Sequence, residues 1–343
     1  YGESYDKERQ DYALTYDAFE NISAEAILKV NAYKSKLKIY KTDSETNKPI
    51  EGVEFNFKYN NGTNIGNYKT DKNGAIKITN LRQGKVIVTE IKTQEKYVLD
   101  ESQKEITLGY EQDASLNISN NRKKGNINIL KVDKDNNELA LEGVEFDLLD
   151  STGKNIIRHV KTDKNGKVEI KNLDIGKYIL KETKSQEKYE ISLEQNITIE
   201  WWKTLNITIE NEKMKGKVKI TKISEDDNLI TGEVAGTPIA NVKFEIYDDS
   251  GKIVDTLITK ADGIAISKDL VVGKYIVKEK ETGKYYEINE KDFEVEITKN
   301  GEVVDLIISN KSKTPPPEEP KEETPKIEVP PIEPIKKLPV TGY

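Results

Sequence analysis

The chain contains three copies of one sequence pattern. The segment "KIYKTD" at residues 38–43 recurs as "NILKVD" at 128–133 and "KITKIS" at 219–224. Likewise, "QGKVIVTE" recurs as "IGKYILKE" and "VGKYIVKE". A fixed internal period means that each copy is one structural unit. The copies, which we call repeats 1, 2 and 3, span residues 37–121, 126–212 and 217–311. The repetition therefore predicts three similar domains in tandem and not one large core.

Each repeat has the pattern of a small β-sandwich. Short segments rich in Val, Ile, Tyr and Thr are separated by turns such as "NNG" at 60–62 and "DKNG" at 71–74. Asn and Gly tolerate the positive φ angles that tight hairpin turns require. We therefore predict an all-β fold of tandem immunoglobulin-like sandwiches, one per repeat.

The two flanks differ from the repeats. The stretch "VNAYKSK" at 30–36 matches the end of a repeat, so residues 1–36 are expected to be the C-terminal remnant of a preceding β domain. Nine of the eleven prolines lie between 315 and 339, mixed with Glu and Lys. Such a segment cannot bury a core and favours extended polyproline II. Residues 312–337 are therefore predicted to be a disordered Pro/Glu-rich linker.

Composition argues against several kinds of function. The net charge of −7, without a basic stripe, argues against a nucleic-acid partner. The absence of cysteine excludes disulfides and thiol catalysis, and a single histidine, His159, argues against a histidine metal site or a Ser-His-Asp triad. The acidic turns at 133–138 and 224–228 lack the glycine and distal glutamate of a calcium loop. We predict neither a metal nor a cofactor.

In each repeat, three polar residues fall on a strand face that should be apolar. Because side chains alternate along a strand, Lys41 shares the face of Leu37 and Ile39. The same test places one lysine, one glutamate and one asparagine inward in the first, penultimate and last strands of every repeat. These residues are Lys41, Glu90 and Asn120; Lys131, Glu182 and Asn211; and Lys222, Glu279 and Asn310.

Two interpretations of this pattern are open. A buried charge is costly unless it is paired, so the residues could form a structural Lys–Glu pair that is hydrogen-bonded to the asparagine. Alternatively, desolvation lowers the pKa of the lysine and raises that of the glutamate, so that a neutral amine attacks the carboxamide. The glutamate then polarises the carboxamide and moves protons, ammonia leaves, and a Lys–Asn isopeptide bond remains.

The repeats resemble a known family over residues 37–311. The lysine of "KxxKxD", the glutamate of "GKYxxxE" and the asparagine of a terminal "I-x-N" are similar to those of collagen-adhesin B-type (SpaA-like) domains of Gram-positive surface proteins and pilins. The resemblance implies a spontaneous isopeptide bond in each repeat. The implied bonds are Lys41–Asn120 assisted by Glu90, Lys131–Asn211 assisted by Glu182, and Lys222–Asn310 assisted by Glu279. Repeat 3 departs from the pattern, with Ser224 in place of the aspartate and a longer first loop.

The sequence "LPVTG" at 338–342 resembles the sorting motif of sortase substrates. The resemblance implies that a sortase cleaves between Thr341 and Gly342, with Leu338 and Pro339 shaping the recognised kink, and that a peptidoglycan precursor takes over the Thr341 carboxyl. It also implies a secreted, cell-wall-anchored protein in which 312–337 spans the wall. The apolar segment and basic tail that usually follow this motif are absent, so we expect a truncated chain.

The leading hypothesis is a structural stalk, monomeric and without enzymatic activity beyond forming its own bonds. It would present an adhesive region located before Tyr1, with host extracellular matrix as the candidate ligand. The alternative is that the repeats themselves act as adhesin or pilin subunits, although no pilin-type "YPK" motif occurs. A hydrolase ranks third, because the inward carboxylates occur singly and not in pairs.

Two adjacent tryptophans, Trp201 and Trp202, form the most prominent aromatic feature. Adjacent strand residues face opposite ways, so we expect one to lie in the core and the other to be exposed. A sugar- or protein-binding patch is the alternative interpretation.

Overall fold

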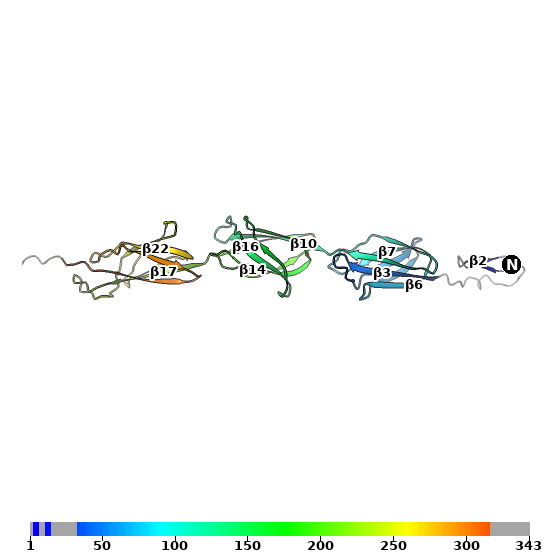
Figure 1. The fold of residues 1–343 in the computed structure, drawn as a ribbon, viewed down its shortest axis with the longest axis horizontal. Helices are drawn as coiled ribbons and strands as arrows, with labels where there is room; N and C mark the ends of the chain where they lie inside the picture. Colours follow the sequence, from blue (N-terminus) through cyan, green and yellow to red (C-terminus); the bar gives the residue numbers. More distant parts are fainter. Residues whose placement is uncertain (1–2, 7–10, 15–32, 316–343) are drawn as a thin grey trace, which may run out of the picture. The chain divides into compact units, whose positions relative to one another are not determined.

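The computed structural model describes residues 3–6, 11–14 and 33–315. The regular elements in these ranges are β-strands, so the predicted all-β class is confirmed (Figure 1). Within the same ranges, no helix is long and apolar enough to cross a membrane. A short antiparallel hairpin of β1 (Glu3–Asp6) and β2 (Asp11–Leu14) comes first. Most of the predicted linker and the whole sorting motif lie outside the described residues.

Repeat 1 is a sandwich of two sheets. One sheet has the strand order β6-β3-β9 and the other β5-β4-β7-β8. The first and last strands, β3 and β9, pair in parallel, and the remaining pairs are antiparallel. The strands are β3 (Tyr33–Asp43), β4 (Glu54–Tyr59), β5 (Asn64–Lys69), β6 (Ala75–Arg82), β7 (Gly84–Lys92), β8 (Lys104–Leu108) and β9 (Asp113–Asn120).

Repeat 2 has the same arrangement, with sheets β13-β10-β16 and β12-β11-β14-β15 and a parallel pair of β10 and β16. Its strands are β10 (Lys124–Asp133), β11 (Glu145–Asp150), β12 (Ile156–Lys161), β13 (Lys167–Asp174), β14 (Gly176–Lys184), β15 (Gln195–Ile199) and β16 (Thr204–Asn211).

Repeat 3 again joins its first and last strands, β17 and β24, in parallel. The strand that corresponds to β6 and β13 is divided here into two short pieces, β20 and β21, which both pair with β17. The other sheet has the order β19-β18-β22-β23. The strands are β17 (Lys215–Ser224), β18 (Lys243–Tyr247), β19 (Ile253–Ile258), β20 (Ile264–Ile266), β21 (Leu270–Val271), β22 (Gly273–Glu281), β23 (Asp292–Ile297) and β24 (Val303–Asn310).

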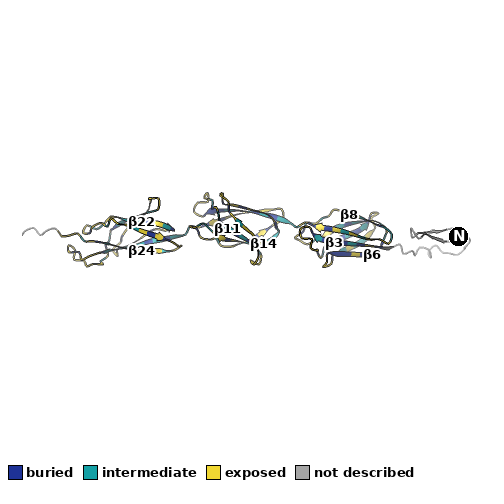
Figure 2. Cartoon of the chain, viewed as in Figure 1, coloured by how far each residue is buried: buried dark blue, intermediate teal, exposed yellow. Residues whose placement is uncertain are grey.

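Each repeat has a hydrophobic core of its own. Buried and exposed positions alternate along the core strands, as can be followed in Figure 2. In β3, for example, Leu37 and Ile39 are fully buried, while Lys38 and Tyr40 between and after them face outward. This alternation matches the period of two that the sequence predicts.

One predicted strand position is wrong. The glutamates lie on β7, β14 and β22, which are third from the end of their repeats and not penultimate. A further strand, β8, β15 or β23, lies between them and the last strand, at the edge of its sheet. These strands are short and carry charged or polar residues, so their pattern is weak. Because an edge strand is only partly covered, it needs less apolar sequence than a central one.

Candidate functional site

Three side chains meet inside every repeat, and we call each set a triad. The lysine comes from the first strand, and the asparagine comes from the end of the last strand. The glutamate comes from an inner strand of the opposite sheet, which is β7, β14 or β22. Lys41, Lys131 and Lys222 are 0% exposed, and no other triad member is more than 5% exposed. The inward direction that alternation predicts for the nine residues is therefore the one observed.

The parallel pairing of the first and last strands brings the lysine to the asparagine. In repeat 1, Lys41 lies opposite Ile118, and Asp43 lies opposite Asn120. Lys41 and Asn120 thus share the inner face of neighbouring strands, near the same end of the sheet. Repeats 2 and 3 have the same register.

Within each triad, the glutamate bridges the other two residues. The lysine Nζ lies 2.7, 3.1 and 2.9 Å from a glutamate Oε2 in repeats 1, 2 and 3. The asparagine Nδ2 donates to Oε1 of the same glutamate at 2.6, 2.6 and 2.5 Å. The lysine Nζ contacts the asparagine Oδ1 in all three repeats. The lysine amine, the asparagine carboxamide and the glutamate carboxylate are therefore in mutual contact.

A phenylalanine closes one side of each triad. Phe55, Phe146 and Phe244 are buried and lie directly opposite the triad glutamates across the sheet. The lysine Nζ lies 5.6, 5.9 and 5.9 Å from the respective ring centroids. This phenylalanine ends the segment "EGVEF" at 51–55 and 142–146 and "ANVKF" at 240–244, and the sequence alone indicated no role for it. In the structure, the ring shields the amine from water.

Burial shifts the protonation equilibrium of the triad lysines towards the neutral amine. Burial lowers the pKa of Lys41, Lys131 and Lys222, and it outweighs the opposing effect of the neighbouring glutamate, which raises the pKa. A lysine whose pKa is lowered in this way has a larger share of the unprotonated, nucleophilic form.

One contact of the asparagines was not predicted. In each repeat, the asparagine Nδ2 also donates to a hydroxyl located three residues after the triad glutamate. These hydroxyls belong to Thr93, Ser185 and Thr282, and the distances are 3.0, 2.7 and 2.8 Å. A sequence signal for this contact exists in "EIKT", "ETKS" and "EKET". In all three segments, the first residue is the triad glutamate and the last carries a hydroxyl, while the two residues between them vary.

The comparison with protein families agrees with this architecture. The prealbumin-like fold domain named SpaA matches residues 35–122, 125–213 and 216–312, three times in tandem and over most of the chain. The chain belongs to the SpaA family. The three repeats are therefore SpaA domains, and we use this name for them below.

Known proteins resemble the SpaA domains of this chain to different extents. The Bacillus anthracis TIE protein is 32% identical, with a TM-score of 0.65 over 81% of this chain and 51% of that protein. The trypsin-resistant surface T6 protein of Streptococcus pyogenes is 37% identical over 62 residues, which are 18% of this chain and 12% of that protein. BcpA, the major pilin subunit of Bacillus cereus, is 15% identical, with a TM-score of 0.46. The chain thus spans about half of the TIE protein and a small part of the T6 protein.

The departures in the third SpaA domain do not disturb its triad. In the first two domains, Asp43 and Asp133 accept the hydroxyl hydrogen of a buried tyrosine, Tyr97 and Tyr189. In the third, Ser224 occupies the aspartate position, and Tyr286 donates instead to Glu233 at 2.8 Å. Glu233 belongs to the longer first loop. The loop therefore supplies the carboxylate that the serine lacks.

Asp133 is a buried carboxylate in a dense hydrogen-bond network. Its Oδ1 accepts from the backbone N–H groups of Asp135 and Asn136, and its Oδ2 accepts from Tyr189 and pairs with Lys213. Burial acts to raise the pKa of Asp133, but the hydrogen bonds from Lys213, Tyr189 and the backbone together lower it to about 2. Both carboxylate oxygens of Asp133, the first residue of the acidic turn at 133–138, are therefore occupied by these contacts.

We expect acid to weaken the second SpaA domain through Asp133. Because its folded pKa lies below the unfolded value of about 3.9, its contribution is complete above pH ~4 and is lost as the pH falls towards ~2. The free energy of unfolding of Asp133→Asn should therefore fall less than that of the wild type between these pH values. Urea denaturation at several pH values measures this difference. The exposed Glu194→Gln serves as the control, and equal slopes for wild type and Asp133→Asn would contradict the assignment.

A turn glycine holds the backbone of each triad lysine. Gly74, Gly166 and Gly263 end the "DKNG"-type turns at positive φ, and their carbonyls accept from the lysine N–H at 2.8 Å. A Cβ at Gly166 would lie 2.3 Å from the carbonyl oxygen of Lys131, and the other two glycines are equally close to theirs. Only glycine allows this approach of the turn to the strand.

We expect Gly166→Ala to destabilise the second SpaA domain by about 3 kcal/mol, from the strained φ together with the clash against Lys131. Gly153→Ala is the matched control. Gly153 also has a positive φ, but its Cβ would meet only a methyl group of Ile179 at 3.5 Å. Thermal unfolding of both variants separates the clash from the backbone strain. Equal losses would show that the contact with Lys131 contributes nothing.

The prediction for the tryptophans is wrong. Trp201 and Trp202 are 42% and 85% exposed, so neither belongs to the core. They lie in the turn between β15 and β16, where strand alternation does not apply, and Trp202 has a φ of 58°. The Nζ of Lys123 lies 4.9 Å from the ring centroid of Trp201.

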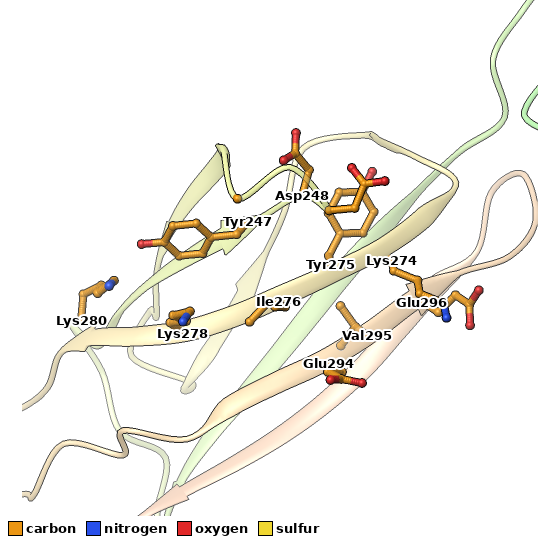
Figure 3. A pocket seen from close by; sticks show the side chains of 12 residues that line it. Tyr247, Asp248, Lys274, Tyr275, Ile276, Lys278, Lys280, Glu294, Val295 and Glu296 are labelled. Atoms are coloured by element: carbon orange, nitrogen blue, oxygen red, sulfur yellow. The ribbon is translucent and has the colours of Figure 1, made fainter.

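A surface hollow lies on the third SpaA domain, and none of the triad residues lines it. Lys278 and Lys280 of β22 lie beside Tyr247 of β18, while Glu294 and Glu296 project from β23 (Figure 3). The two lysine Nζ atoms lie 5.7 and 5.4 Å from the centroid of the Tyr247 ring. Among the described residues, no group of three or more His, Cys, Asp or Glu side chains is placed to hold a metal ion.

Proposed function

We propose that the three SpaA domains form the load-bearing stalk of a bacterial surface protein, each domain closed by a Lys–Asn isopeptide bond. This proposal rests on one observation that recurs in every domain. A buried lysine of the first strand, a buried asparagine of the last strand and a buried glutamate of the opposite sheet contact one another. The domain limits proposed are those of the repeats, 37–121, 126–212 and 217–311. A streptococcal surface protein among the relatives supports the location.

In the proposed reaction, the neutral Nζ of the lysine attacks the side-chain carbonyl carbon of the asparagine. The glutamate accepts a proton from the attacking nitrogen and delivers one to Nδ2, which leaves as ammonia. One C–N bond forms and one breaks, and the glutamate returns to its initial state. Proximity supplies much of the acceleration, because folding holds both partners in contact.

The buried setting favours reaction over a merely structural ion pair. A protonated lysine beside an ionised glutamate would have to be fully desolvated, which is costly even when the two are paired. The lowered pKa of the lysines reduces that cost by favouring the neutral amine. The neutral amine is also the form that attacks, so burial favours both the uncharged state and the chemistry.

Intact mass tests the proposal. The wild-type chain should weigh less than its sequence by the mass of three ammonia molecules. Proteolysis should release cross-linked peptides that contain Lys41 with Asn120, Lys131 with Asn211, and Lys222 with Asn310. A mass equal to that of the plain sequence would leave the triads as structural ion pairs and remove the basis of the proposal.

We further propose that the stalk is attached through residues 338–342, by sortase cleavage between Thr341 and Gly342. The proline-rich linker at 312–337 would then separate the SpaA domains from the cell wall. Incubation with a sortase and an amine nucleophile should release Gly342–Tyr343 and yield a product in which the Thr341 carboxyl is joined to the nucleophile. The control is Pro339→Ala, for which this product should be lost while the three ammonia losses remain.

A further inference from the structure

We propose that the hydroxyls of Thr93, Ser185 and Thr282 act on the leaving nitrogen during bond formation. This inference rests on the proposed isopeptide chemistry. Each hydroxyl lies 2.7–3.0 Å from the Nδ2 that would depart as ammonia, and each is half-buried at the edge of its triad. The hydroxyl thus contacts a reacting atom and not merely a supporting residue.

A β-bulge places the hydroxyl there. Strict alternation would turn the third residue after an inward glutamate outward. In repeat 1, however, Phe55 pairs with Glu90 and Glu54 pairs with Lys92, so Ile91 is an extra residue. The extra residue shifts the phase of the strand, and Thr93 turns back towards the triad.

The other two SpaA domains carry the same device. The pairings Phe146–Glu182 and Glu145–Lys184 leave Thr183 as the extra residue of the second domain. In the third domain, the pairings Phe244–Glu279 and Lys243–Glu281 leave Lys280. Ile, Thr and Lys at the bulge show that its side chain is free to vary, whereas a hydroxyl follows two residues later in all three cases. The bulge and the hydroxyl therefore belong together.

The geometry gives the hydroxyl a defined role. The two hydrogens of the Nδ2 group have two acceptors, the glutamate Oε1 and the hydroxyl oxygen. This arrangement fixes the carboxamide with Oδ1 facing the lysine. When the lysine attacks, Nδ2 becomes pyramidal and gains a lone pair. The hydroxyl oxygen continues to accept a hydrogen bond from one Nδ2 hydrogen, so the new lone pair on Nδ2 points towards the glutamate. The glutamate then supplies the proton that lets ammonia leave.

The second SpaA domain offers the clearest test, because the other two domains of the same molecule report the normal rate. The full chain is pulse-labelled during translation and quenched in denaturant at intervals, and peptides from each domain are weighed. Ser185→Ala should form the second bond about tenfold more slowly, as expected for the loss of one well-aligned hydrogen bond. The first and third bonds should form at their usual rates.

Conservative and control variants separate the contact from general effects of mutation. Ser185→Thr should restore the rate, because it restores the acceptor. Thr208→Ala removes an exposed hydroxyl from the same strand as Asn211 and should leave the rate unchanged. Thr93→Val keeps the shape of the side chain without its acceptor, and it should slow the first bond alone.

A purely structural role predicts a different result: Ser185→Ala would lower the unfolding midpoint through the lost hydrogen bond to Asn211, and the second bond would form at the wild-type rate. A wild-type rate in both Ser185→Ala and Thr93→Val would overturn the role of the hydroxyl and leave the isopeptide proposal intact. If no domain of the wild type loses ammonia, the proposed function itself fails.

Discussion

Pulled from its two ends, a molecule of Asn211→Ala should lengthen by one step that the wild type lacks. Unravelling the second SpaA domain would release the residues from 124 to 211, a chain length on the order of 300 Å at roughly 3.5 Å per residue. The wild type should show no such step at the same force, because the three proposed bonds would hold its SpaA domains closed. Single-molecule force spectroscopy measures this difference directly.

The reason lies in the parallel pairing of the first and last strands. The chain enters the second domain at the start of β10 and leaves it at the end of β16, and these two strands lie side by side in one direction. A bond from Lys131 to Asn211 would let tension pass along β10, across the bond and out of the domain. The segment between these two residues, which are 80 positions apart in the sequence, would carry no load.

Asn211→Ala is the preferred variant for this measurement, because it leaves Lys131 paired with Glu182. Removing the lysine would instead leave a buried carboxylate without its partner and weaken the fold for a second reason. Asn206→Ala, on the exposed face of the same strand, is the matched control and should behave like the wild type. An unfolding step of similar length in the wild type would mean that the second domain is not closed covalently.

The sequence was sufficient to find the triad residues because alternation is a local property of strands. In "LKIYKTD", the inward direction of Lys41 follows from Leu37 and Ile39 alone, and the buried lysine bears this out. The pairing of β3 with β9 could not be derived in this way. It joins segments that are far apart in the chain, and nothing in either segment specifies a parallel neighbour.

The same local rule fails wherever the strand is interrupted. Thr93 would face outward in an uninterrupted strand, but the bulge at Ile91 turns it inward. The residues of "EIKT" do not predict a bulge. The extra residue is exposed, so any side chain can occupy its position. Trp202 was assigned to a strand and lies in a turn. In both cases, the backbone departs from the period of two that the prediction assumed.

The third SpaA domain illustrates how a local departure can be compensated at a distance. Ser224 removes the carboxylate that the other domains place beside their buried tyrosine, and no replacement could be identified from the sequence alone. In the structure, Glu233 reaches Tyr286 from the longer loop. The longer loop therefore compensates for the substitution at Ser224. An alignment of the three repeats, position by position, shows these as two unrelated differences.

Replacing Glu182 by glutamine should have the largest effect on the chemistry and stability of a single domain. Glutamine keeps the size of the side chain and an acceptor for Asn211, but it cannot carry a proton between the two nitrogens. We expect the second bond to form at least a hundredfold more slowly, in line with the loss of a positioned acid–base group. The purified chain should therefore retain the mass of one ammonia.

The stability of the domain should fall with the bond. Closing a loop of 80 residues is worth roughly 4–5 kcal/mol if the entropy of disulfide loops applies. For a domain of this size, that loss corresponds to a decrease in unfolding temperature on the order of 20 °C. Calorimetry of the whole chain should therefore show one SpaA domain unfolding well before the other two.

Two comparisons decide whether the missing bond is the cause of this loss. Glu187→Gln makes the same substitution at an exposed site of the same domain and should change neither the number of ammonia molecules lost nor the stability. Asn211→Ala removes the bond while leaving the Lys131–Glu182 pair in place, so its unfolding temperature should fall by a similar amount. If Glu182→Gln lowers the unfolding temperature while the full ammonia loss persists, the glutamate stabilises the domain through its contacts alone, and proton transfer by Glu182 is not required for the bond.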